Sequence, residues 1–279
     1  MSFSFRWLGT ACFEIRLDSG ETLILDPYMD DAFNCPLGSD DIERADLICL
    51  THGHFDHVLD VGRLAHRLGS TVICSDQVAR NMMKRFDIPA HQIIEAAPGE
   101  IFLRNSFGIE VVKGTHVDNR AYFAEQMGLD SPETISDDEM VRKFFEMLPD
   151  ESYREQFLSY MGKYPPGRQL NFILHMPGNL RCYVFGSAPD PELFSIAEAS
   201  RAQVLFLQIL KDRELGAVDA ARRVGASVVV PSHHDAFIPG QSVPDVEKVR
   251  EQIDVEPGMS FLDPEAGKWY EIGLNAEAV

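Results

Sequence analysis

Four side chains that can bind a metal ion lie within seven consecutive residues, 51–57. They are His52, His54, Asp56 and His57, and imidazole with carboxylate is a ligand set that zinc, iron and manganese accept. Side chains two residues apart point to the same side of an extended chain, so His52 and His54 are predicted to face one ion together. Asp56 and His57 follow where the chain is expected to turn into a helix, so one loop would serve two metal positions. The alternative interpretation is a solvated polar loop.

The sequence around this loop predicts a buried strand before it and a helix after it. Residues 45–50 are continuously apolar, and residues 58–68 have about three turns of helical periodicity. The metal-binding side chains then lie in the polar loop between them, where Gly53 is expected to allow a tight bend. A loop at the end of a strand is a usual place for a binding site in layered α/β folds.

Strand and helix patterns alternate along the rest of the chain. Strands are expected over residues 3–8, 11–17, 22–26, 71–74, 108–113, 169–176, 180–186, 204–210 and 227–231, and helices over residues 77–86, 192–200, 217–224 and 243–253. Residues 119–168 are rich in Asp, Glu and Met and are predicted to form a helical insertion. Within it, Ser136 is the expected N-cap of a helix ending at Leu148, and a second helix is expected after Asp150.

The spacing HxHxDH, carried here by residues 52–57, resembles the signature of the metallo-β-lactamase superfamily without a departure. The resemblance covers nearly the whole chain apart from residues 119–168. It implies an α/β fold, a four-layer αβ/βα sandwich with the metals at the shared edge of its sheets. We therefore expect a single domain over residues 1–279, with the helical insertion at residues 119–168 inside it.

Two further motifs of this family have counterparts in the chain. A strand ending in Asp matches residues 23–27, and the resemblance implies that Asp26 orients a ligand histidine by hydrogen bonding. An ordinary turn Asp before a proline is the alternative. A histidine after a strand matches His116, which would complete a three-histidine site with His52 and His54. A surface histidine is the alternative there.

The last histidine motif of the family matches His233, which follows an apolar strand and its proline. By resemblance, His233 would join Asp56 and His57 on a second metal. His234 competes for this assignment, but neighbours in an extended chain point in opposite directions, so only one should reach the metal. We favour His233 and treat His234 as a wall residue or proton shuttle.

The chain departs from the family pattern at one position. Most hydrolytic members carry an Asp after a Gly that bridges both metals, whereas Ser187 follows Gly186 here. A neutral hydroxyl is a poor bridge, so the second metal is expected to be held more weakly. Asp190 is the alternative group that would reach in. Ser187 is grouped with Asp26 as a residue that supports the ligands.

This ligand set implies hydrolysis. A metal held by neutral imidazoles lowers the pKa of bound water from about 15.7 towards 7, which supplies hydroxide at ordinary pH. The expected cofactor is one or two Zn²⁺ ions, with Mn²⁺ or iron as alternatives, and Asp56 would orient the nucleophile or carry its proton. Metal affinity should fall as pH drops through about 6.5. Serine chemistry is disfavoured because the chain has no GxSxG turn.

The substrate is harder to predict. Residues 7–13 and 51–57 look like the branch of the family that contains ascorbate-6-phosphate lactonase, so an ester, lactone or phosphoester of a small metabolite is the leading hypothesis. Arg120 and His234 are the candidate substrate-binding residues, although a lone Arg is more often a surface residue. The alternatives are a non-catalytic metal-binding or regulatory module of the same fold, and a phosphodiesterase or nuclease.

Composition bears on partners and compartment. The formal net charge of -19 repels nucleic acid and anionic lipid, so we expect a small-molecule substrate, no nucleic acid and no membrane. No signal peptide or membrane-spanning run is recognised. Five cysteines without CxxC spacing favour reduced thiols in a cytoplasmic protein. Assembly into a homo-oligomer is left open.

Overall fold

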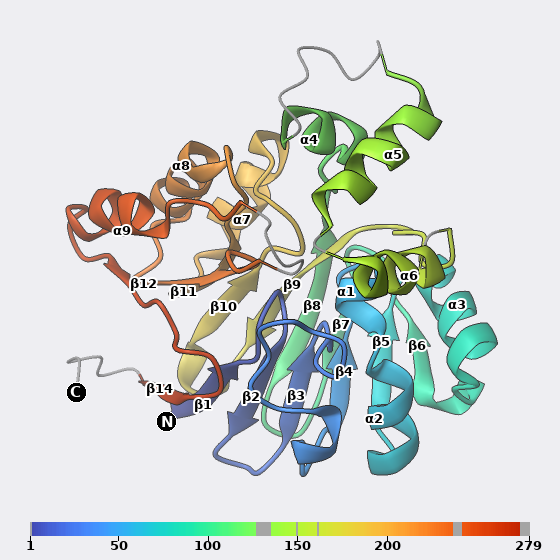
Figure 1. Cartoon of the computed structure of the whole chain (residues 1–279). Helices are drawn as coiled ribbons and strands as arrows, with labels where there is room; N and C mark the ends of the chain where they lie inside the picture. Colours follow the sequence, from blue (N-terminus) through green and yellow to red (C-terminus); the bar gives the residue numbers. More distant parts are fainter. Residues whose placement is uncertain (1, 127–134, 149, 161, 237–241, 274–279) are drawn as a thin grey trace.

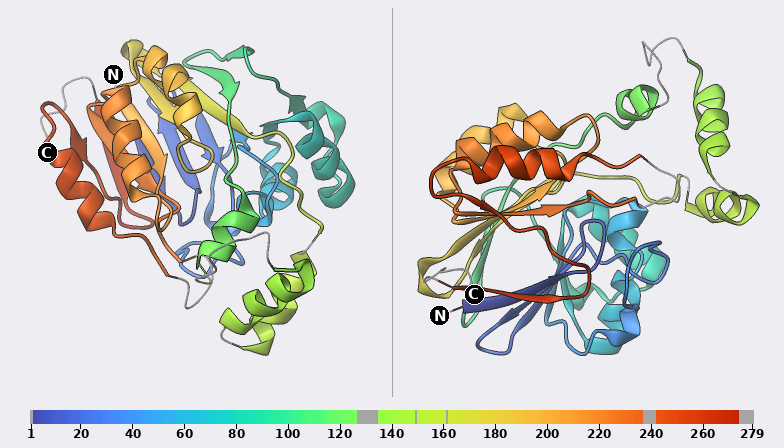
Figure 2. Two further views of the ribbon diagram at one scale, coloured as in Figure 1. Left: turned by 90° about the horizontal axis from the view of Figure 1, so that it is seen from above. Right: turned by 60° about the vertical axis from the view of Figure 1, so that its left-hand side comes forward.

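The strands of this protein form two sheets that pack face to face. The computed structural model describes residues 2–126, 135–148, 150–160, 162–236 and 242–273. Within these residues each sheet has seven strands, and helices cover the outer face of each sheet (Figure 1, Figure 2). This arrangement confirms the predicted αβ/βα sandwich.

The first sheet contains the strand that leads into the metal-binding loop, and its order is β14-β1-β2-β3-β4-β5-β6. Its first strands form an antiparallel meander, and β3 to β6 are parallel because helices carry the chain back between β4, β5 and β6. The strands are β1 (Ser2–Trp7), β2 (Phe13–Leu17), β3 (Thr22–Leu25), β4 (Leu47–Cys49), β5 (Thr71–Cys74), β6 (Ile93–Glu95) and β14 (Trp269–Gly273), and the helices are α1 (Phe55–Val58), α2 (Val61–Leu68) and α3 (Asp76–Phe86).

The second sheet has the order β13-β12-β11-β10-β9-β8-β7. It is antiparallel from β7 to β10 and parallel from β10 to β13. The strands are β7 (Ile101–Leu103), β8 (Gly108–Lys113), β9 (Leu170–His175), β10 (Arg181–Val184), β11 (Val204–Gln208), β12 (Val228–Ser232) and β13 (Ser260–Phe261), and the helices are α7 (Phe194–Ser200), α8 (Glu214–Val224) and α9 (Val246–Asp254).

Three apolar clusters hold the four layers together. The cluster between the sheets is built around Phe206 of the second sheet, whose ring meets Phe5 and Phe13 of the first edge to face, with centroids 5.5 and 4.9 Å apart. A second cluster joins α1, α2 and α3 to the first sheet, and a third joins α7, α8 and α9 to the second sheet. The sheets are thereby fixed relative to each other, and so are the loops at their ends.

The chain turns into a helix earlier than the sequence predicts, and that helix is interrupted. Residues 55–57, expected in the loop, already belong to α1, and the expected helix over residues 58–68 is α2 from Val61 onward. The interruption falls at Asp60, whose buried carboxylate accepts the backbone N–H groups of Met29 and Asp30. These hydrogen bonds tie the start of α2 to the loop after β3.

The described residues between 119 and 168 contain three helices, α4 (Asn119–Gln126), α5 (Asp137–Met147) and α6 (Glu151–Tyr160). The N-cap prediction is confirmed, because Ser136 Oγ accepts the Glu139 N–H. Figure 1 and Figure 2 show these helices outside the four layers. The assignment of this segment as an insertion within one domain stays a prediction. No helix in the described part of the chain is long and apolar enough to cross a bilayer.

Candidate metal centre

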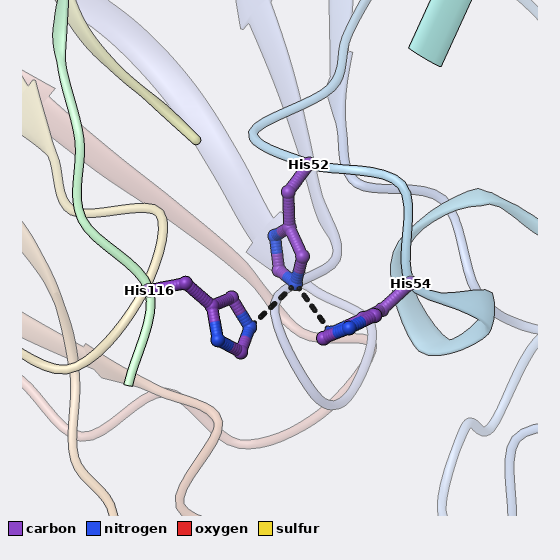
Figure 3. A group of neighbouring side chains, drawn as sticks. All are labelled: His52, His54 and His116. Carbon is purple, nitrogen blue, oxygen red and sulfur yellow. Dashed lines mark hydrogen bonds between the residues drawn. The ribbon is translucent and has the colours of Figure 1, made fainter. Parts of the chain in front are cut away.

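Three histidines from two different sheets meet at one edge of the sandwich. His52 and His54 follow β4 of the first sheet, and His116 follows β8 of the second. His52 Nε2 lies 3.0 Å from His54 Nδ1 and 3.2 Å from His116 Nε2 (Figure 3). Figure 3 shows the three rings pointing toward one another. One ring nitrogen from each lies within 4.8 Å of the others, so a single ion could be shared by all three.

A second group of potential ligands lies beside the first. It consists of Asp56 and His57 from α1 and His233 from the end of β12. His233 Nε2 is 3.3 Å from Asp56 Oδ2, and His57 Nε2 is 3.8 Å from the same oxygen. The rings of His52 and His57 are 3.9 Å apart between centroids, so the two groups are contiguous. The structure thus brings together the six side chains that the sequence analysis grouped as ligands.

The hydrogen bonds around the first group leave two unprotonated nitrogens facing each other. Thr51 Oγ1 donates its proton to Asp26 Oδ2 at 2.6 Å, so it can only accept from His52 Nδ1, 3.0 Å away. His116 Nδ1 donates to the Val117 carbonyl oxygen at 2.6 Å. In the neutral rings both Nε2 atoms therefore carry lone pairs, although they lie only 3.2 Å apart. A cation satisfies both nitrogens, whereas a hydrogen bond between them cannot form.

Burial keeps these three rings neutral. Removal from water lowers the pKa of His52 well below the ordinary value and lowers the pKa of His54 to about 4. Burial also lowers the pKa of His116. Unprotonated imidazole is the form that binds a metal ion, so the protein holds this group in its ligand form at neutral pH.

The second group has a different charge balance. Burial opposes a charge on His57, but the carboxylates of Asp26 and Asp56 outweigh burial and raise the pKa of His57. Burial likewise opposes the charge of Asp56, but His57 and His233 hold its pKa well below its usual range. The second group of ligands therefore stabilises a positive charge between its side chains. Its two nitrogens and one carboxylate, like the three nitrogens of the first group, fit a zinc-type cation.

Asp26 organises both groups from the end of β3. Its carboxylate, 1% exposed, accepts the Thr51 N–H at 2.7 Å, the Thr51 hydroxyl at 2.6 Å and His57 Nδ1 at 2.9 Å. It thus orients His57 directly and His52 through Thr51, in line with the role that the resemblance implies. Thr51 itself was not singled out by the sequence analysis, although it adjoins the first ligand.

We predict that Asp26→Asn weakens metal binding by about ten- to a hundredfold. An amide group cannot accept from three donors as the carboxylate does, so one of its N–H groups would face Thr51 or His57. Competition with a chelating indicator measures the change. Asp46→Asn is a matched control, because Asp46 also accepts a backbone N–H, that of Thr22, away from the histidines. Equal affinity in the wild type and Asp26→Asn would contradict this role.

Gly53 is required for a reason other than the expected bend. Its φ is not positive, so its backbone conformation does not require glycine. Instead, the segment after α6 lies directly on it, because the Gly53 N–H donates to the Pro166 carbonyl oxygen at 2.9 Å. A Cβ atom there would lie 2.5 Å from the Pro165 carbonyl oxygen. The glycine therefore allows close packing between the ligand loop and the last residues of the predicted insertion.

Gly53→Ala is expected to destabilise the fold by about 1–3 kcal/mol, because two backbone segments must separate to admit the methyl group. The midpoint of thermal unfolding measures this. Gly216→Ala in α8 is the control, since its Cβ would meet nothing closer than 3.9 Å, and it should leave the midpoint unchanged or raise it. Similar midpoints for the two variants would show that the backbone segments at Gly53 can separate at little cost in stability, which would contradict this prediction.

The structure separates His233 from His234. His234 stacks on Trp7 with 4.6 Å between ring centroids, and its Nε2 lies 3.4 Å from Asp263 Oδ1. His233 is the one grouped with Asp56. The preference for His233 agrees with this geometry, and the contacts of His234 give no support to its assignment as a substrate-binding residue.

The remaining candidates have structural contacts. Ser187 Oγ accepts the Val117 N–H at 3.5 Å, next to the carbonyl group that orients His116. Asp190 caps the turn after it by accepting the Glu192 N–H, so its suggested approach to the metals is not observed. The Arg120 guanidinium donates to a backbone carbonyl oxygen, that of Ile135, and a role in substrate binding stays a prediction.

An aromatic contact that the sequence analysis missed links α6 to the ligand loop. Phe55 lies between two potential ligands in sequence and stacks on Tyr160 of α6, with ring centroids 4.9 Å apart and planes 15° apart. Phe157 of α6 and Tyr28 meet the same ring edge to face. The sequence signal that could have revealed this contact was a large apolar residue within the otherwise polar segment 51–57. The described part of the predicted insertion thereby packs against the candidate centre.

Known proteins share both the sequence pattern and the fold. The model of the metallo-β-lactamase superfamily matches residues 5–121. A UPF0173 metal-dependent hydrolase of Listeria monocytogenes is 29% identical over 245 residues, which cover 85% of this chain and 86% of the relative. Igni18, a metallo hydrolase from the archaeon Ignicoccus hospitalis, superposes with a TM-score of 0.70 at 17% identity, covering 98% of this chain and 99% of that one. The chain is therefore similar to the metallo-β-lactamase superfamily in sequence over residues 5–121 and to a metallo hydrolase in fold over nearly its whole length.

Stronger local similarity is confined to part of the chain. A UPF0173 metal-dependent hydrolase of Solibacter usitatus is 41% identical over 73 residues, 26% of this chain and 31% of the relative. The alignments with the first relatives span about a third of the relatives' own length. The match to the superfamily model and the fold agree with the resemblance drawn from HxHxDH, whereas the finer likeness to the lactonase branch stays a prediction.

Proposed function

We propose that this protein is a metal-dependent hydrolase. The observation that carries the proposal is that the unprotonated Nε2 atoms of His52 and His116 face each other 3.2 Å apart, with His54 beside them. The names of the relatives, metal-dependent hydrolases, support the same activity.

His52, His54 and His116 would hold one ion, and Asp56, His57 and His233 a second. When bound, divalent ions of this kind activate water as a nucleophile and polarise the bond to be cleaved. Asp26 keeps the Nε2 atom of His57 free by accepting from Nδ1. His57 and His233 keep the pKa of Asp56 low, against the effect of burial, so Asp56 stays a carboxylate. As a carboxylate it can orient a water molecule or accept a proton from it.

The proposed metal is zinc, because both donor sets combine imidazole nitrogens with at most one carboxylate. Mn²⁺ and iron are the alternatives that the same ligands accept. The proposed substrate is an ester, lactone or phosphoester of a small metabolite rather than a nucleic acid, since the net charge of -19 opposes a polyanion. The five free cysteines, four of them buried, support the cytoplasm as its compartment.

Elemental analysis of the freshly purified protein, followed by a screen of lactones, carboxylic esters and phosphoesters, tests the proposal. We expect close to two equivalents of metal and turnover that a chelator removes and added Zn²⁺ restores. One firmly bound metal without turnover on any substrate class would favour the non-catalytic module. Turnover that survives complete removal of metal would overturn the proposal.

A further inference from the structure

His233 adopts an uncommon backbone conformation where it reaches the second group of ligands. Its φ is 54°, in the left-handed region that residues other than glycine usually avoid. From there its Nε2 lies 3.3 Å from Asp56 Oδ2. A residue held in this region at a candidate site depends on surrounding contacts that fix it.

The contacts come from the loop that joins β1 to β2. The His233 N–H donates to the Thr10 carbonyl oxygen, with 2.7 Å between nitrogen and oxygen. Thr10 also has a positive φ, 47°, and its own N–H donates to both carboxylate oxygens of Asp235, at 3.0 and 3.1 Å. Thr10 therefore accepts a hydrogen bond from the backbone of His233 and donates one to the side chain of Asp235, two residues further along the chain.

Further contacts surround this connection. Trp7 Nε1 also donates to the Thr10 carbonyl oxygen, at 3.0 Å, and the Trp7 ring stacks on His234. Thr10 is 1% exposed, so its own end of these bonds is shielded from water. Asp235 is the charged member of the set and supplies the acceptor that the buried Thr10 N–H needs.

We propose that Asp235 is a positioning residue for the second metal ion. By accepting the Thr10 N–H, it fixes the Thr10 carbonyl group on the backbone of His233 and so aims His233 Nε2 at Asp56. It acts through Thr10 and His233 rather than as a ligand. The inference rests on the proposed metal centre. It explains how one of the two groups of ligands, that of Asp56, His57 and His233, obtains its geometry.

The test is a titration of metal-free full-length protein with Zn²⁺ in competition with a chelating indicator, which yields one affinity for each ion. In Asp235→Ala we expect the second Zn²⁺ to bind about ten- to a hundredfold more weakly and the first to be unchanged. Asp235→Asn keeps one carbonyl oxygen that can accept the Thr10 N–H, so it should recover most of the lost affinity. Asp254→Ala is the matched control, since Asp254 also accepts a backbone N–H, that of Phe261 at 2.8 Å, and belongs to neither group of ligands.

The outcomes separate this inference from the proposed function. If the wild type binds no Zn²⁺, the metal centre itself is wrong. If the wild type binds two ions and Asp235→Ala binds both unchanged, or if Asp254→Ala loses the second ion equally, only the role of Asp235 is overturned. Should Asp235→Ala fail to fold, Asp235→Glu gives the same test, because it keeps the charge and displaces the acceptor by one methylene group.

Discussion

Replacing His52 by Ala is expected to remove the first metal ion and to lower turnover by at least about a thousandfold, because free water keeps a pKa of about 15.7 instead of about 7. His52 has the central position in the first group, with its Nε2 close to both His54 and His116. Its loss also leaves the Thr51 hydroxyl without its imidazole partner. Metal content by elemental analysis and turnover on the substrate found in the screen measure the two effects.

His91→Ala is the matched control for this variant. His91 is exposed and lies in the turn before β6, so its loss should change neither metal content nor turnover. Both proteins should give the same far-ultraviolet circular dichroism, which separates loss of a ligand from loss of the fold. A His52→Ala protein that retains metal and turns over substrate like the wild type would show that this cluster is not the catalytic centre.

The features that the sequence predicted correctly depend on local pattern. The spacing of His52, His54 and Asp56 keeps them close together whatever the rest of the chain does, although Asp56 lies in α1 and not in the loop. Strands β5 and β8 have the predicted bounds, because a short apolar run limited by turn residues is a local signal. Sequence similarity to a family then located His116 and His233, which no local pattern connects to residues 52–57.

The features that the sequence did not reveal depend on contacts between distant segments. Strand β14 pairs with β1 at the opposite end of the chain, and no turn in the sequence links them. The need for Gly53 comes from the Pro165 carbonyl group, and the need for Asp235 comes from Thr10, which lies 225 residues away. Local periodicity contains no information about such neighbours, so these roles become visible only after the sheets have packed.

The pH dependence of metal binding is also changed by the packing. A single loss near pH 6.5, the expectation for ordinary histidines, treats all the ligands alike. In the folded protein, burial lowers the pKa of His52 and His54, whereas Asp26 and Asp56 overcome burial and raise the pKa of His57. A proton therefore competes with the metal for His57 at a higher pH than it does for the first group.

We expect the two ions to be lost at different pH values as the solution is acidified. The second ion should weaken first, by about tenfold per pH unit once the pH is below the raised pKa of His57, because each binding event must displace one proton. The first ion should stay bound to much lower pH, since the pKa of His54 is about 4 and that of His52 is also depressed.

Dialysis at a series of pH values from 8 to 4, followed by elemental analysis, would show two equivalents falling to one before falling to none. The two groups act as controls for each other, because both experience the same solution and the same fold. Simultaneous loss of both ions near pH 6.5, or earlier loss of the first ion, would contradict the assignment. The order of loss is the informative quantity. The carboxylates of Asp26 and Asp56 raise the pKa of His57, whereas the pKa values of His52, His54 and His116 are lowered, so the two groups should lose their ions at different pH.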